Sequence, residues 1–489
     1  MINPFQRLKL LQPNKFNERR SAYQRLYGLR ENPFPSIAQF SPTVDDPRHN
    51  GQIYDKTFRE EEEKRFFQLF VQPPTAQPPL SLGFIQMDRQ AGGHGNGISS
   101  FLHHIKKRIN EQEWEDWMSN PDEPSLFALA VHILPKPRQH RHFWQMSRLI
   151  FESLAEEKLF SAIDVQFRAA LLLRLLNEQQ IAFLAKRPAD EVTAILQSQE
   201  RFADLLKQHQ LTLAAFCEEA ERQLRSVSTT ISESFLQHFV SAGSELKGLW
   251  EKWQKESMAV NSYQWRKNGI QWLIDGLIPI IILAGYQRFY LLLDEFEKIY
   301  IYQNARERDH FLDTLRQSFY ERDSAAVRHQ FITTVLTIHP SIYRYLNKHW
   351  RRVGLDNLAP LEASHMANIS IELGPSTVEK LKHLLTTYLD SFRLDEDEDE
   401  HEDEHEDQAR RGRPKGFLTL YPFADNALEP ALEAARFYPS DTLWFAHAIL
   451  RKAATEEVSP PITRHFVEEF INSGVRPPRA EEDDLFRGD

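Results

Sequence analysis

Five short apolar runs alternate with longer amphipathic segments along the chain. The runs lie at 80–87, 126–134, 289–293, 331–337 and 367–373. Most of the segments that separate them have apolar residues at helical spacing. Short apolar runs that alternate with helical segments are typical of buried strands in a parallel α/β sheet.

Between the second and third runs the pattern is helical almost throughout. Residues 142–267 repeat apolar positions at i, i+3, i+4 and i+7, which predicts an all-helical insertion into the α/β core. The pattern divides the chain into an N-terminal arm and linker (1–79), a first core part (80–141), the helical insertion (142–267), a second core part (268–374), a helical lid (375–475) interrupted at 394–416, and a C-terminal tail (476–489).

Composition places the chain among globular proteins. Of its 489 residues, 41% are apolar and 26% are charged, a balance that supports two or three packed domains. The single cysteine, Cys217, excludes an intramolecular disulfide and a cysteine zinc site. The longest apolar stretch, 277–293, contains Pro279 and Gly285 and is a poor membrane span. No signal-peptide pattern opens the chain, so we expect a cytoplasmic protein with no membrane partner.

Much of the net charge of −11 comes from one tract. Eleven of the thirteen residues at 395–407 are Asp or Glu, so this segment is predicted to be a disordered loop. It is followed by Arg-Gly-Arg-Pro at 411–414, which resembles the core of an AT-hook. Arg411 and Arg413 are therefore candidate DNA contacts in an A·T-rich minor groove. The alternative, that these cations only neutralise the acidic run, stays open.

A glycine-rich loop follows the first predicted strand and precedes a predicted helix. AGGHGNGISS at 91–100 matches the phosphate-binding pattern G-x-x-x-x-G-K-[ST], except that Ile98 occupies the lysine position. Such a loop binds phosphates because its backbone N–H groups converge at a helix N-terminus. The candidate ATP-binding residues are Gly92, Gly93, Gly95, Asn96, Gly97, Ile98, Ser99 and Ser100, with Ser99 also a Mg²⁺ ligand.

The third apolar run ends in two acids. FYLLLDEFEK at 289–298 has the form of a Walker B motif, in which Asp294 would hold Mg²⁺ through water and Glu295 would polarise the attacking water. A glycine loop alone also makes plain turns, and an apolar strand ending in two acids is common. Their occurrence together, in order and with strands between and after them, predicts a P-loop core that binds ATP and Mg²⁺.

At this point the chain resembles the AAA+ ATPases of the ExeA-like, transposition-regulator and replication-initiator clade. YGLRENPF at 27–34 is similar to the segment that leads toward the adenine pocket in this clade. TVLTIHPSIYRYLNKHWRRVGLDNLAPL at 334–361 resembles its sensor-1 strand and the arginine-bearing segment beyond it, and the stretch from Phe423 to about 471 resembles its helical lid. The resemblance implies an AAA+ core with ATP at a subunit boundary, and hence a homo-oligomer.

The resemblance also implies roles for single residues. The sensor-1 position falls on Thr337 or His339. An arginine finger that acts on a neighbouring subunit would be Arg351 or Arg352, with Arg344 a weaker choice, and each could equally be a surface arginine.

The lid departs from the pattern of the clade. Ser440 stands where many members carry the sensor-2 arginine, so this sensor is absent unless Arg436 substitutes for it.

Loss of the lysine sets the expected activity. A cation about 3–4 Å from the triphosphate contributes several kcal/mol, and Ile98 cannot supply it. We therefore expect a nucleotide-dependent switch or assembly platform that hydrolyses ATP poorly or not at all, with protein partners and DNA as a further candidate. The alternative is a non-catalytic AAA+-like scaffold that works through its helical insertion and acidic loop. The intact Asp294–Glu295 pair favours the first, and Ile98 and Ser440 favour the second.

Two histidine pairs are candidate metal ligands. His103 with His104, and His140 with His142, have no cysteine or carboxylate nearby at ligand spacing, so we interpret them as surface or helix-face residues.

Overall fold

The computed structural model describes residues 21–37, 40–42, 44–73, 78–87, 97–111, 127–136, 138–255, 262–321, 324, 327, 330–394 and 420–477. The chain divides into two compact units. Unit 1 combines Met1–Glu60, Met87–Phe101 and Leu373–Asp489, and unit 2 combines Glu61–Gln86 and Leu102–Glu372.

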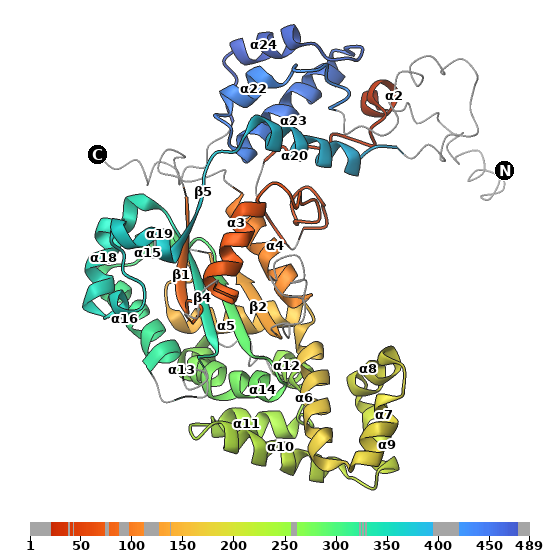
Figure 1. The fold of residues 1–489 in the computed structure, drawn as a ribbon, viewed down its shortest axis with the longest axis vertical. Helices are drawn as coiled ribbons and strands as arrows, with labels where there is room; N and C mark the ends of the chain where they lie inside the picture. The colour runs from red at the N-terminus through yellow and green to blue at the C-terminus, as the bar shows by residue number, and fades with distance from the viewer. Residues whose placement is uncertain are drawn as a thin grey trace, which may run out of the picture. The chain divides into compact units, whose positions relative to one another are not determined.

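A five-stranded parallel sheet forms the centre of unit 2 (Figure 1). Its strands are β1 (Leu82–Met87), β2 (Ala128–Ile133), β3 (Arg288–Leu293), β4 (Ile332–Ile338) and β5 (Ser370–Leu373), in the order β2-β3-β4-β1-β5. The predicted α/β class and the five strands are confirmed. The fifth strand is shorter than its apolar run, because helix α19 (Ala363–Ile369) occupies the first three residues of that run.

The strands pair in a register that buries both faces of the sheet. Residues 82–86 of β1 lie opposite 334–338 of β4, and residues 289–293 of β3 lie opposite 332–336 of β4. Every residue of β2 and β4 is buried. A strand that is covered on both faces has no exposed side for polar residues. Its sequence is therefore a continuous apolar run.

One face of the sheet is covered by α3 (Glu60–Phe66), the π-helical turn η1 (Phe67–Val71) and α4 (Ile98–Asn110). The Phe66 ring lies 6.3 Å from that of Tyr290 on β3, whose hydroxyl donates to the Phe70 carbonyl at 3.1 Å. A Cβ at Gly83 of β1 would lie 2.6 Å from the Phe70 ring, so only glycine fits there. The close approach of η1 to β1 thus depends on one residue.

Ion pairs and backbone contacts fix α4 against its neighbours. Glu63 of α3 lies 3.0 Å from His104 and 3.4 Å from Arg108 of α4, and all three are buried. At its far end, the Asn110 carboxamide accepts from the Ala130 N–H at 2.7 Å and donates to the Ala130 carbonyl at 3.0 Å. Asn110 thereby pairs with the outer edge of β2 as a neighbouring strand would.

Helices fill the interval between β2 and β3, as predicted. They are α5 (Phe143–Glu156), α6 (Leu159–Leu175), α7 (Glu178–Ala185), α8 (Ala189–Gln197), α9 (Gln199–Gln208), α10 (Leu213–Val227), α11 (Glu233–Ser241), α12 (Leu246–Lys255), α13 (Ser262–Trp272), η3 (Leu273–Leu277) and α14 (Ile278–Leu283).

An aromatic core and a buried carboxylate organise this helical region. The rings of Trp253 and Trp272 stack with centroids 4.6 Å apart, and Trp265 packs edge-on against both. Asp164 of α6 accepts the N–H groups of Leu246 (2.7 Å) and Lys247 (3.0 Å) at the start of α12. A buried carboxylate therefore satisfies helix donors that would otherwise lack partners.

Helices that precede and follow β4 in the sequence complete unit 2. After β3 come α15 (Phe296–Tyr302), α16 (Ala305–Arg316) and the π-helical turn η4 (Gln317–Glu321), and after β4 come η5 (Pro340–Ile342), α18 (Tyr343–Arg352) and η6 (Leu355–Asn357). Trp350 of α18 packs on Phe84 of β1 with ring centroids 5.5 Å apart. Phe84 and Gly83 point to opposite faces, so α18 covers the face opposite η1.

Unit 1 contains a helical core made of α2 (Ala22–Tyr27), α20 (Val378–Ser391), α22 (Glu429–Ala434), α23 (Pro439–Thr455) and α24 (Arg464–Asn472). The segment 27–34 is part of this core, with Tyr27, Leu29 and Phe34 fully buried.

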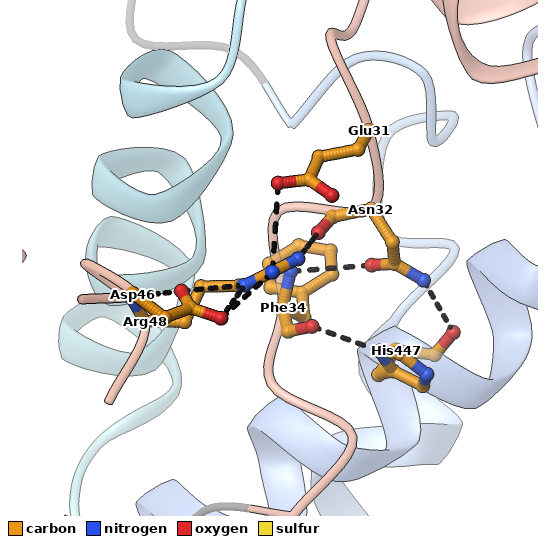
Figure 2. Close-up of polar contacts among 6 residues, drawn as sticks. All are labelled: Glu31, Asn32, Phe34, Asp46, Arg48 and His447. Atoms are coloured by element: carbon orange, nitrogen blue, oxygen red, sulfur yellow. Dashed lines mark hydrogen bonds and ion pairs between the residues drawn. The ribbon is translucent and has the colours of Figure 1, made fainter. Parts of the chain in front are cut away.

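Figure 2 shows how polar contacts anchor the end of that segment. The Asn32 amide donates to the His447 carbonyl at 3.0 Å, and the Phe34 carbonyl lies 2.8 Å from His447 Nδ1. Arg48, paired with Asp46, donates to the Asn32 carbonyl at 2.7 Å.

The predicted loop at 394–416, with Arg411 and Arg413, lies outside the described residues except for Leu394. Among the described helices, none is both long and apolar enough to cross a membrane.

Candidate functional site

The carboxyl edge of the sheet is where a ligand is expected. The connection after β1 passes β4 and β3 to reach β2, whereas the later connections run in the other direction. Right-handed connections of opposite direction lie on opposite faces, so the strand ends beside β1 and β4 form a topological switch point. Open α/β sheets bind their ligands at such a point. The predicted site residues on β3 and β4 lie at this edge.

The helix predicted after the glycine loop is present and begins at Ile98. Gly97, the last residue before it, has φ +74, a conformation that glycine adopts without strain. Ile98 is buried, and Ser99 and Ser100 are partly exposed. Residues 92–96 lie outside the described residues, so the shape of the loop stays a prediction.

Asp294 directly follows β3, and two residues of β2, together with the next residue along the chain, contact its backbone and carboxylate. It is 2% exposed, and its backbone N–H donates to the Ile133 carbonyl at 3.1 Å. Oδ1 accepts the Glu295 N–H at 2.8 Å, and Oδ2 lies 3.3 Å from His132 Nε2. The carboxylate is therefore fixed in orientation, as a ligand for hydrated Mg²⁺ requires. The strand that Asp294 follows is not adjacent to β1, because β4 lies between them.

Glu295 occupies an unusual backbone position at the start of α15. Its φ of 52 places a non-glycine residue in the left-handed region, which is uncommon and found often at functional sites. Its Oε1 lies 2.7 Å from Lys298 Nζ. This ion pair would have to compete with any water that Glu295 orients.

Thr337 connects β4 with a third carboxyl group that the sequence analysis did not single out. Its Oγ1 donates to Glu297 Oε2 at 2.9 Å and accepts the Phe296 N–H at 3.3 Å. Thr337 and Glu297 are both fully buried. Burial raises the pKa of Glu297 to about 7, and Asp294 and Glu295 add to the rise, while the hydrogen bond from Thr337 opposes it.

His339, the other sensor-1 candidate, has a different neighbour. Its Nδ1 lies 2.6 Å from Ser341 Oγ, and burial lowers its pKa. Thr337 contacts the acidic segment after β3 through the Phe296 N–H and the Glu297 carboxyl group.

Two histidines also lie near this edge. His132 of β2 contacts Asp294, and its ring centroid is 6.4 Å from that of His103 in the second turn of α4. Burial lowers the pKa of His103 to about 3, and the nearby Lys106 adds to the fall. A histidine inside the apolar run at 126–134 was the signal that could have identified His132. Within the described residues, no group of three His, Cys, Asp or Glu side chains is arranged to hold a metal ion.

The arginine-finger candidates lie on α18 and are paired within their own chain. Arg351 forms an ion pair with Glu362, and Arg352 Nη1 lies 2.5 Å from Asp309 Oδ2. Both arginine side chains are 52% exposed, so they remain accessible to a neighbouring molecule. Arg344 of the same helix is exposed. In unit 1, Ser440 lies in the first turn of α23, and Arg436 is exposed with φ 51.

The chemistry of this edge follows from its charges. Asp294, Glu295 and Glu297 lie within one helical turn of sequence; Asp294 and Glu297 are buried, and the charges of Asp294 and Glu295 disfavour ionisation of Glu297. A divalent cation would relieve the repulsion between these carboxylates.

Comparison with known protein families, curated proteins and solved structures finds no match to this chain.

Proposed function

We propose that the chain is an ATP-binding protein of the AAA+ type that acts as a nucleotide-dependent switch or assembly platform. The observation that carries this proposal is the fixed carboxylate of Asp294 at the end of a buried central strand, in a parallel sheet compatible with a P-loop core. In this proposal Asp294 and Ser99 would hold the Mg²⁺ of ATP, and residues 92–100 would bind the phosphates.

Hydrolysis would follow the usual in-line attack of water on the γ-phosphate. Glu295 would orient the water after leaving Lys298, and Thr337 would sense the γ-phosphate at the end of β4. Arg351 or Arg352 would contribute a cation to the site of a neighbouring copy, because an arginine supplied in trans neutralises charge in the transition state. Since Ile98 supplies no cation, turnover by this chain would be slow or absent.

Burial of Ile98 supports the alternative of a non-catalytic scaffold. Ile98 is 7% exposed, and such a buried position suits an apolar side chain better than an ammonium group. In that case the helical insertion and the loop at 394–416 would bind protein or DNA, and the α/β core would serve as their support.

Binding of a fluorescent ATP analogue with Mg²⁺ tests the proposal. Ile98→Lys is expected to tighten binding by tenfold or more, since a partly desolvated cation next to the triphosphate contributes at least about 1.4 kcal/mol. Ile98→Met is the matched control, because it keeps an apolar side chain of similar volume. Asp294→Ala should remove the benefit of Mg²⁺. If neither the chain nor Ile98→Lys binds the analogue, the scaffold is the correct interpretation.

A further inference from the structure

His132 is a polar residue inside an otherwise apolar strand. It lies on β2 opposite Leu292 of β3, and its side chain is 3% exposed. A buried imidazole needs hydrogen-bond partners, because burying a polar group without one costs about 1–3 kcal/mol. Its Nε2 lies 3.3 Å from Asp294 Oδ2, and that side chain is also 3% exposed.

The two oxygens of Asp294 are contacted from two different elements. The Glu295 backbone N–H, at the start of α15, reaches Oδ1 at 2.8 Å, and His132, from β2, reaches Oδ2. Rotation about the Cβ–Cγ bond moves both oxygens, so each of the two contacts opposes it. The contact from β2 adds a second restraint on the carboxylate, from a different element.

The His132 ring is itself confined. His103, one turn into the helix that begins at Ile98, packs against it with an interplanar angle of 62°. The helix that follows the glycine loop therefore contacts a residue that contacts Asp294. This series of contacts connects that helix with Asp294 through side chains.

We propose that His132 is a positioning residue for Asp294: its Nε2–H donates to Oδ2 and holds the carboxylate in the orientation that binds the hydrated Mg²⁺ of ATP. The role in metal binding rests on the proposed function, whereas the donated hydrogen bond does not. Groups that orient a metal-binding carboxylate contribute about 10–100-fold to metal affinity or activity.

Three substitutions distinguish this role from simple packing. His132→Gln places an amide N–H near the position of Nε2, and His132→Asn places one near Nδ1. His132→Ala removes both. The measurement is the ratio of affinities for a fluorescent ATP analogue with Mg²⁺ and with EDTA, compared with the ratio in Asp294→Ala.

We expect His132→Ala and His132→Asn to lower this ratio about 10–100-fold and His132→Gln to keep it within about threefold. Adding His132→Ala to Asp294→Ala should cause no further loss. The proposal would be overturned if His132→Gln and His132→Asn lowered the affinity ratio equally, or if His132→Ala did not lower it. Either result would leave ATP binding itself intact.

Nitrogen-15 NMR of the histidine imidazoles tests the hydrogen bond between His132 and Asp294 without any nucleotide. The resonances of His132 are identified by their loss in His132→Gln, and we expect Nε2 to carry the proton and to shift in Asp294→Ala. A proton on Nδ1 alone, or no response to Asp294→Ala, would overturn the proposal. If no variant binds ATP, the proposed function fails, and the NMR result still decides whether His132 holds Asp294.

Discussion

Replacement of Glu297 by glutamine should flatten the dependence of stability on pH. Glu297 is fully buried at the start of α15 and accepts the Thr337 hydroxyl. Because Glu297 is fully buried near Asp294 and Glu295, its ionised charge destabilises the folded state. The folded protein therefore binds the Glu297 proton more tightly than the unfolded chain does.

The size of the effect follows from the two pKa values. Glu297 has a pKa of about 7 when folded, against 4.5 for an ordinary glutamate. Because the folded pKa is raised, its contribution to stability is complete below pH 4.5 and disappears as pH rises through 7. The full contribution is about 3.4 kcal/mol, of which about 2.5 kcal/mol is lost between pH 5 and pH 8. Glutamine does not titrate, so the Glu297→Gln variant should not lose this contribution as pH rises.

Urea unfolding at pH 5, 6, 7 and 8 measures this difference. Tryptophan emission is a suitable probe, because Trp253, Trp265, Trp272 and Trp350 are buried in unit 2. Relative to the unsubstituted chain, Glu297→Gln should gain about 2.5 kcal/mol on going from pH 5 to pH 8. Glu178→Gln on the exposed helix α7 is the control, and its profile should run parallel to that of the unsubstituted chain. A parallel profile for Glu297→Gln would refute the reasoning.

Three further substitutions test individual contacts. Asp164→Ala should lower the free energy of unfolding by about 3 kcal/mol, because two backbone N–H groups lose their acceptor. Asp164→Asn keeps one acceptor and should lower it by about 1 kcal/mol. Urea unfolding of both variants measures the difference. Gly83→Ala should destabilise by about 2–3 kcal/mol through its clash with the Phe70 ring, and an unchanged thermal midpoint would show that the π-helical turn moves freely. Arg352→Ala should change stability by less than about 1 kcal/mol yet lower the ATPase rate of Ile98→Lys about a hundredfold or more, while Lys348→Ala on the same helix leaves the rate unchanged.

The strands and the helical region could be predicted because each depends on local periodicity. Continuous apolar runs specify strands buried on both faces, and the helical spacing at 142–267 specifies helices whatever they pack against. The order of the strands could not be read in this way. It depends on which edges pair, so β4 lies between β1 and β3 although nothing in its sequence says so.

The candidate site was predicted only in part. Asp294 and Glu295 stand at the end of an apolar run, and this placement alone marks them as candidates. His132 lies 162 residues before Asp294, and only the pairing of β2 with β3 brings them together. Glu297 is close in sequence, yet its burial depends on β4, which supplies Thr337. Whether residues 92–96 bind phosphate stays a prediction.

The helical region between β2 and β3 has a consequence for how the chain folds. The two strands pair side by side, but roughly 150 residues separate them, and closing so long a loop costs about 4–5 kcal/mol of chain entropy. If the helices fold first, through their mostly local contacts, the flexible length to be closed falls to a few tens of residues. Closure then costs about 2 kcal/mol less, which corresponds to about thirtyfold in rate. Early folding of the helical region would thus accelerate pairing of β2 with β3, and substitutions in the Trp253–Trp272 core should slow assembly of the sheet.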